Sequence, residues 1–239
     1  NFKSFLNALS SDIRITVLRT ERPVEISGHQ ITTTYYQFFV ESAEAIDHLL
    51  NATGIKFQPL AEAPTLDPVK IFVKYMALPD GVLLKAFTVY SLPESLVEGF
   101  ISELYGVAER VILYIRPIPP DIATLKIRSL KTLLEGIVNA DAARGRRPRD
   151  ETARMLRRIS EISEAVSSGA TRLFQVIFNV CVSGRNGEKL AENAKKIKQI
   201  LQSRMLLIDC PAFMQYGMAT GPVSYTHLRA HETSLHLVC

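Results

Sequence analysis

The sequence contains no tryptophan and only three cysteines among its 239 residues. Cys181, Cys210 and Cys239 are widely spaced and odd in number, so they fit neither a disulfide framework nor a zinc-binding spacing, and we expect a reducing compartment. Long apolar runs and a secretory signal are also missing, so the sequence predicts no transmembrane segment. With 12 Gly and 12 Pro, the composition excludes collagen-like and low-complexity proteins. What remains is an ordinary globular composition, 47% hydrophobic and 22% charged.

The net charge of +4 is unevenly distributed along the chain. Residues 1–120 carry a net charge of −3, residues 121–222 carry +7, and the last 17 residues are neutral. Because a local excess says more about a partner than the total does, the second half is where we look for an anionic partner.

The segment 223–239, VSYTHLRAHETSLHLVC, resembles the translation of a sequencing adapter, a contaminant of metagenomic reading frames. His227 and His231 lie four residues apart and would share a helix face, which is the one argument for a metal site here. We favour the artefact and treat 223–239 as a non-native tail. We therefore expect the natural sequence to run to about Pro222 in a fragment of a longer protein, since Asn1 also stands where a Met would begin a chain.

Residues 1–69 predict a smaller α/β unit consisting of a hairpin and a helix. The expected elements are a helix at 2–9, strands at 13–18 and 32–40, and a helix from about 43 to 51. Pro23 and Gly28 indicate a long connection between the strands, and Ser42 is the expected N-cap of the second helix, with Gly54 after its end. Prolines in 58–69 indicate a connector.

A β-α-β pattern then occurs twice, in residues 70–118 and 169–222. The expected elements are a strand at 82–90, a helix at 94–105 and a strand at 110–115, then a strand at 172–182, a helix around 190–201 and a strand at 205–210. Two such units predict an α+β fold with a ferredoxin-like βαββαβ sheet, whose right-handed crossovers place both helices on one face. In the second unit, one strand face is expected to carry Phe174, Val176, Phe178, Val180 and Val182, with Cys181 buried opposite.

Residues 119–168, between the two units, predict a long helical hairpin inserted in the sheet. Pro119 and Pro120 start its first helix, and residues 145–148 break it. Its apolar residues recur at helical spacing: Ile122, Leu125, Leu130, Leu133, Leu134, Ile137 and Val138. The second helix, at 150–167, is expected to bury Met155, Leu156, Ile159, Ile162 and Val166.

The hairpin also carries a basic cluster. Between Lys126 and Arg158 there are ten Lys or Arg and four acidic residues, and the tip holds Arg144, Arg146, Arg147 and Arg149. One interpretation is a contact surface for DNA, anionic lipid or an acidic protein. The other is a solvated tip, offset by pairs such as Arg157 with Glu161. Aromatic residues are absent from 126–158, which argues against stacking on single-stranded bases.

Motifs for catalysis or cofactor binding are lacking. Residues 184–189 (GRNGEK) join a strand to a helix as phosphate loops do, but the glycine spacing is too short and Leu190 stands where a Ser or Thr would bind magnesium. His29 and His48 are isolated from any nucleophile motif. We therefore predict no catalytic, metal or cofactor site in this segment.

The order of these elements resembles the N-terminal region of the type IV secretion and conjugation ATPases, within the HerA–FtsK group of P-loop motors. The resemblance spans about residues 1–222 and rests on Pro79-Asp80-Gly81, Leu92-Pro93-Glu94, Tyr114-Ile115-Arg116-Pro117, the basic hairpin, residues 169–182 (GATRLFQVIFNVCV) and Pro211-Ala212-Phe213-Met214-Gln215.

The resemblance implies a cytoplasmic ATPase, peripheral at the inner face of the membrane, that energises transfer of DNA or protein. ATP and magnesium would bind only in the motor domain that follows this region in the family. This segment would then be a non-catalytic docking and assembly domain, whose partners are secretion-channel or membrane-complex proteins and other copies of the parent ATPase. The alternative is a free-standing ferredoxin-like module that binds nucleic acid through the basic hairpin, and a small α+β enzyme with an unrecognised site is the third hypothesis.

Overall fold

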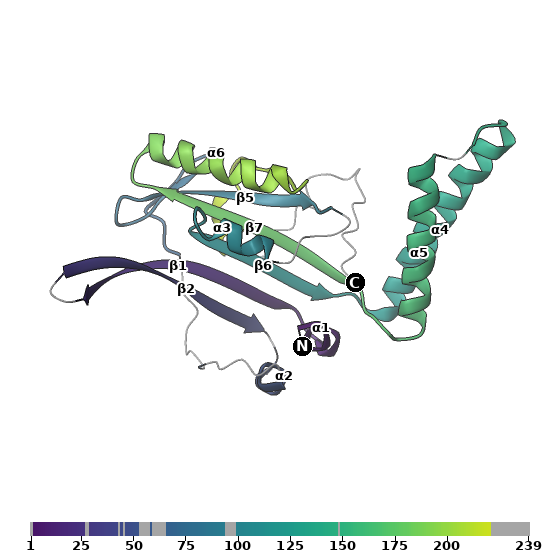
Figure 1. Cartoon of the computed structure of the whole chain (residues 1–239), viewed down its shortest axis with the longest axis horizontal. Helices are drawn as coiled ribbons and strands as arrows, with labels where there is room; N and C mark the ends of the chain where they lie inside the picture. Colours follow the sequence, from purple (N-terminus) through teal and green to yellow (C-terminus); the bar gives the residue numbers. More distant parts are fainter. Residues whose placement is uncertain are drawn as a thin grey trace.

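An eight-stranded antiparallel sheet forms the body of the computed structural model (Figure 1). The structure describes residues 2–26, 29–42, 44, 46–52, 58, 66–93, 99–147 and 149–220. The strand order of the sheet is β2-β1-β6-β7-β5-β4-β3, and β8 pairs with β5. The strands are β1 (Ile13–Ile26), β2 (His29–Ser42), β3 (Lys70–Ile71), β4 (Met76–Ala77), β5 (Leu83–Ser91), β6 (Arg110–Pro117), β7 (Phe174–Gly184) and β8 (Leu207–Asp209). The predicted adapter-like tail lies outside the described residues.

The two β-α-β units interleave within this sheet. The first is β5, α3 (Phe100–Leu104) and β6, and the second is β7, α6 (Gly187–Ser203) and β8. β7 lies between β6 and β5, and β5 lies between β7 and β8, so one strand of each unit lies between the two strands of the other. The α+β class is thus confirmed, whereas the ferredoxin-like relationship stays a prediction. Residues 94–98, the first half of the predicted helix before α3, lie outside the described residues.

One face of the sheet is covered by both crossover helices, as predicted from the handedness rule. The cluster there joins Phe100 and Leu104 of α3 to the α6 residues and to apolar side chains of the strands. The buried stripe of α6 is the predicted one, Leu190, Ala194, Ile197 and Leu201. The predicted strand face is also confirmed, with Phe178, Val180 and Val182 in this cluster.

β1 and β2, the two described strands within residues 1–69, extend the same sheet. β1 pairs with β6 from Ile13 to Leu18 and with β2 along its whole length. The predicted connection through Pro23 was wrong, because β1 continues to Ile26. Pro23 is tolerated in this strand since it lies beyond the part of β1 that pairs with β6, where a missing N–H breaks no second ladder.

The N-cap prediction for Ser42 was also wrong. Ser42 ends β2, its hydroxyl lies 2.9 Å from that of Ser11, and helix α2 begins only at Asp47. The short helices α1 (Phe2–Ala8) and α2 (Asp47–Ala52) lie side by side beneath β1 and β2 (Figure 1). Phe5, Leu9 and Ile46 pack there against Ile115 and Phe174.

The other face of the sheet is covered by α7 (Gln215–Thr220). Met218 and Ala219 pack on Leu84, Ala86 and Cys181. The last carbonyl groups of α7 accept hydrogen bonds from the sheet: Asn179 Nδ2 donates to Met218 O at 3.0 Å, Arg110 Nη1 to Ala219 O at 3.0 Å, and Arg14 to Thr220 O. These side chains satisfy carbonyls that a helix end leaves without partners, and the two arginines also match its partial negative charge.

Candidate interaction site

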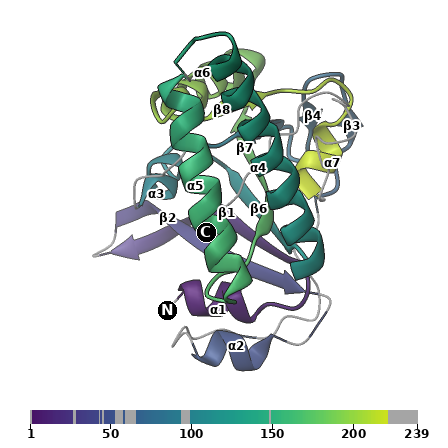
Figure 2. The ribbon, with the colours of Figure 1, turned by 90° about the vertical axis from the view of Figure 1, so that its right-hand side faces the viewer.

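The helical hairpin between β6 and β7 projects away from the sheet (Figure 1, right; Figure 2). It consists of α4 (Pro120–Ala143) and α5 (Asp150–Ser167), within a residue of the predicted boundaries. At its base Ile118 N donates to Leu173 O at 2.9 Å, and Arg172 Nη1 donates to Leu9 O at 3.0 Å. The base is therefore tied both to the strands and to the end of α1.

The hairpin has its own small apolar core. Its buried members are Ala123, Ile127, Leu134, Ile159, Ile162 and Leu173, with Ile118, Leu130, Leu156 and Val166 partly buried around them. Burying a Leu or Ile fully contributes about 1.5 to 3 kcal/mol. This seam holds α4 against α5 as a two-helix arm.

A second apolar stripe of α4 remains uncovered, so the apolar residues predicted at helical spacing divide between two sides of the helix. Leu125 is 63% exposed and Leu133 60%, and Ile122 and Ile137 are each 42% exposed. At 100° per residue these four side chains fall within an arc of about 120°, and the buried residues of α4 lie about 100° away. Met155 of α5, predicted to be buried, is 47% exposed as well.

The tip of the hairpin carries the four predicted arginines, Arg144, Arg146, Arg147 and Arg149, and all four side chains are exposed. Gly145 has a φ of 67°, which lets the chain turn between the helices without a strained side chain. Within the part of the chain that the structure describes, no ion pair involves any of the four. Their charge is thus directed to solvent.

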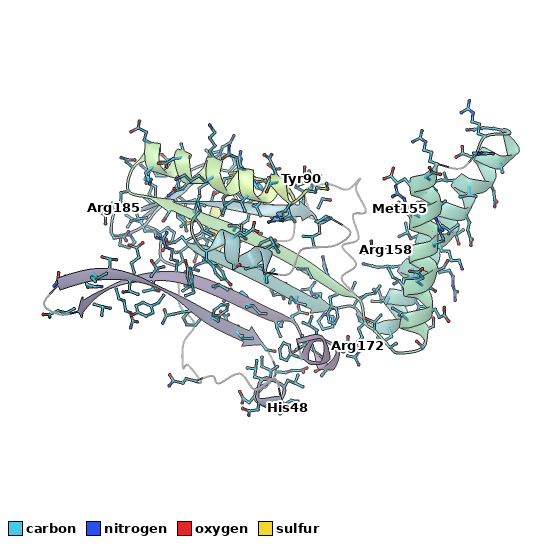
Figure 3. The ribbon with its side chains drawn as sticks, in the orientation of Figure 1. His48, Tyr90, Met155, Arg158, Arg172 and Arg185 are labelled. Atoms are coloured by element: carbon cyan, nitrogen blue, oxygen red, sulfur yellow. The ribbon has the colours of Figure 1, made fainter. Side chains whose placement is uncertain are left out.

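The basic surface continues along α5. Arg154, Arg157, Arg158 and Glu161 line a shallow hollow, and Arg158 lies on the side of α5 toward the sheet in Figure 3. The predicted pair of Arg157 with Glu161 was wrong, because these side chains do not come within ion-pair distance although they share the hollow. Glu161 therefore offsets the charge of the hollow only in part.

The turn between β7 and α6 is built as a helix start. Asn186 is the N-cap of α6, and its Oδ1 accepts a hydrogen bond from Lys189 N at 2.8 Å. Lys189 Nζ lies 2.8 Å from Glu192 Oε2 in an ion pair, which with Lys196 lowers the pKa of Glu192 to about 2. A Cβ on Gly184 would lie 2.4 Å from Leu190 N, so this glycine allows the helix to pack closely on the strand. Both the amide and the lysine that a phosphate would need are already engaged.

Other candidate groups also have structural roles. Cys181 is fully buried, as predicted, and burial raises the pKa of its thiol to about 12. His48 is exposed on α2, at the edge of the molecule in Figure 3. A hollow of about 150 Å³ beside α7 is lined by Arg14, Glu41 and Arg110 among others, but the arginines there donate to the α7 carbonyls.

The described part of the chain contains no group of three or more His, Cys, Asp or Glu placed to bind a metal ion. Its helices include none with the length and apolar character to cross a bilayer. No protein-family model matches the chain, and no curated protein matches it either. The resemblance to the conjugation ATPases therefore stays a prediction from the residues quoted above.

The stripe on α4 is a candidate site that the sequence analysis did not separate from the side of α4 that packs on α5. Its residues were recognised as apolar and at helical spacing, in one set with the residues that pack on α5. The signal was available in their spacing, because Ile122, Leu133 and Ile137 fall on one side of a helical wheel and Ile127, Leu130 and Leu134 on another.

Proposed function

We propose that this chain is a docking and assembly domain of a conjugation ATPase of the type IV secretion class, and that the α4–α5 hairpin is its docking arm. The observation that carries the proposal is the uncovered α4 stripe of Ile122, Leu125, Leu133 and Ile137 on an element that projects from the sheet. Exposed apolar groups gathered on one face are typical of a protein–protein contact.

The surroundings of the stripe suit a helix-packing contact. Ser129, Gly136 and Ala140 fall on the same side of α4 by helical spacing, and a Cβ on Gly136 would meet nothing within 4 Å. A partner helix or strand could approach α4 closely between Leu125 and Leu133. The partner we propose is a component of the secretion channel or its membrane complex, at the cytoplasmic face of the membrane, with ATP and magnesium bound in a separate motor domain of the parent.

The test changes the stripe in the complete gene, expressed in a donor cell that carries its transfer system. A Leu125→Ser/Leu133→Ser variant is expected to lower DNA transfer by about tenfold or more, since losing an interface anchor costs at least 1 to 2 kcal/mol. The matched control is Arg128→Ser/Glu135→Ser, which places two serines on an exposed face of α4 away from the stripe and leaves the net charge unchanged.

Both variants must accumulate to wild-type levels and keep the wild-type circular dichroism. Loss of transfer in the stripe variant alone supports the docking arm. Equal transfer by the two variants contradicts it.

A second candidate function, nucleic-acid binding by a free-standing module, is favoured by one observation. The four tip arginines are exposed and, among the described residues, lack ion-pair partners. Four such groups on phosphates would contribute about 3 to 4 to the slope of log K against log salt. Changing all four to Ser should remove that contribution, whereas changing Arg185, Lys189, Lys195 and Lys198 should not. Equal binding by wild type and tip variant, or by neither, removes this function.

A further inference from the structure

β2 ends the sheet of described strands, and over residues 30–40 it lacks the features that usually protect an edge strand. β2 is 14 residues long and pairs with β1 in an unbroken register from His29 to Ser42. No described strand pairs with its other side. Residues 30–40 (QITTTYYQFFV) contain no charge, proline or glycine. Natural edges are kept from pairing by charges, prolines, bulges or shortness, and residues 30–40 of β2 have none of these.

The other edge strands of the sheet provide a contrast within the same molecule. β3 has two residues and β8 has three. Short strands offer few backbone groups to a neighbour. β2 is therefore the edge at which this sheet could be extended over a long distance.

β2 also carries exposed apolar and aromatic side chains, which are typical of a strand with neighbours on both sides. Phe38 is 62% exposed, Ile31 48%, Tyr35 43% and Val40 37%. Tyr36 is fixed by Tyr105, since the two rings stack with their centroids 4.6 Å apart and the Tyr36 hydroxyl donates to Tyr105 O at 2.8 Å. Tyr36 is thus fixed, whereas the side chains of Tyr35 and Phe38 and the outer edge of the strand remain exposed.

The ends of β1 and β2 that lie past β6 give a second reason to expect pairing at this edge. β1 pairs with β6 only as far as Leu18, so residues 19–26 and 29–36 extend past β6 as a two-stranded ribbon (Figure 1, lower left). Such a ribbon alone is only marginally stable in water. Pairing two of them would produce a four-stranded ribbon with its aromatic side chains packed between neighbours.

We propose that β2 pairs antiparallel with β2 of a second copy of this chain, which joins the two sheets across a two-fold axis. A self-paired strand places its own residues opposite one another. Because residues 30–40 are uncharged, no register that pairs them brings like charges together. Eleven paired residues would form about eleven backbone hydrogen bonds. This pairing is independent of the hairpin and of the function proposed for it.

The test is the mass of the full chain in solution, measured by light scattering over a range of concentrations. The wild type is expected to approach twice the 26.7 kDa of one chain. Thr32→Lys/Thr34→Lys, which puts two charges on exposed edge positions, is expected to remain at the single-chain mass. Gln199→Lys/Gln202→Lys adds the same charge to exposed positions of α6 and should behave as wild type.

Hydrogen exchange provides a readout that does not depend on the variants. Amide protection within residues 30–40 of the wild type should rise with protein concentration, and protection in β7 should not. A wild type that stays at the single-chain mass, a lysine variant that still doubles, or open-ended aggregates in place of a dimer each overturn the proposal.

Discussion

The side chain of Gln215 takes the place of a neighbouring strand at Ala86. Its Oε1 accepts from Ala86 N at 2.7 Å, and its Nε2 donates to Ala86 O at 3.3 Å. Ala86 lies in β5 between the residues paired with β4 and those paired with β8, where no described strand covers its edge. Gln215 is fully buried, and its Nε2 also lies 3.2 Å from Pro211 O. One carboxamide therefore links α7 to the centre of the sheet.

Replacing Gln215 should be costly even when its volume is preserved. Gln215→Met keeps the length of the side chain but leaves the Ala86 N–H and C=O buried without partners. We expect the free energy of unfolding to fall by about 2 to 5 kcal/mol, since each buried unsatisfied group costs about 1 to 3 kcal/mol. Urea unfolding measures the change. Gln202→Met, at an exposed position of α6, is the control, and an equal effect of the two substitutions would refute the role of Gln215.

The glycines on either side of the β7–α6 turn should respond in opposite ways to alanine. Gly184→Ala would push a Cβ against the Leu190 backbone, so we expect about 1 to 3 kcal/mol of destabilisation. Gly187→Ala meets nothing within 4 Å at the start of α6 and should be neutral or stabilise by up to about 1 kcal/mol. Denaturant unfolding of both variants checks the difference. Similar free energies of unfolding for the two variants would mean that α6 does not pack closely on β7 at Gly184.

Glu109 should make stability depend on pH in the direction opposite to that of an ion-paired carboxylate. Burial raises the pKa of Glu109 above its usual 4.5, although a hydrogen bond from Ser183 Oγ at 3.0 Å and the nearby Arg19 act against this shift. At pH values between 4.5 and the folded-state pKa, Glu109 is therefore protonated in the folded protein and ionised in the unfolded chain. Stability then falls as pH rises from about 4.5 through the folded-state pKa.

Glu109→Gln should remove this part of the pH dependence. The free energy of unfolding of the wild type, relative to that of the variant, is expected to be constant below pH 4.5 and to decline above it. Chemical unfolding at a series of pH values measures both. Glu188→Gln, which alters an exposed side chain, controls for the change in net charge. Parallel curves for wild type and Glu109→Gln would contradict the assignment.

The sequence predicted those elements in which local pattern and tertiary packing agree. The alternating face of β7, the buried stripe of α6 and both hairpin helices follow from periodicity alone. Prediction failed where the outcome depends on distant partners. Pro23 lies within β1 because the pairing with β6 reaches only Leu18, and Ser42 stays in β2 because β1 pairs with it through Ile13.

The candidate site was predicted only in part for the same reason. The tip arginines were recognised from charge alone, because a short turn between two helices leaves them exposed. The α4 stripe was not separated from the packed side of the helix, since apolar spacing does not say how much of a helix its neighbour covers, and α5 covers only one side of α4. No local sequence pattern indicates the role of Gln215, because its partner Ala86 lies 129 positions earlier in the chain.

Sequencing the source gene downstream of codon 222 tests whether this chain is the docking half of a conjugation ATPase. If the proposed function is correct, the frame continues without the adapter-like segment 223–239 and reaches a phosphate loop of the form Gly-x-x-x-x-Gly-Lys-Ser/Thr. A genomic stop codon near residue 222, or a continuing frame without a phosphate loop, would contradict it.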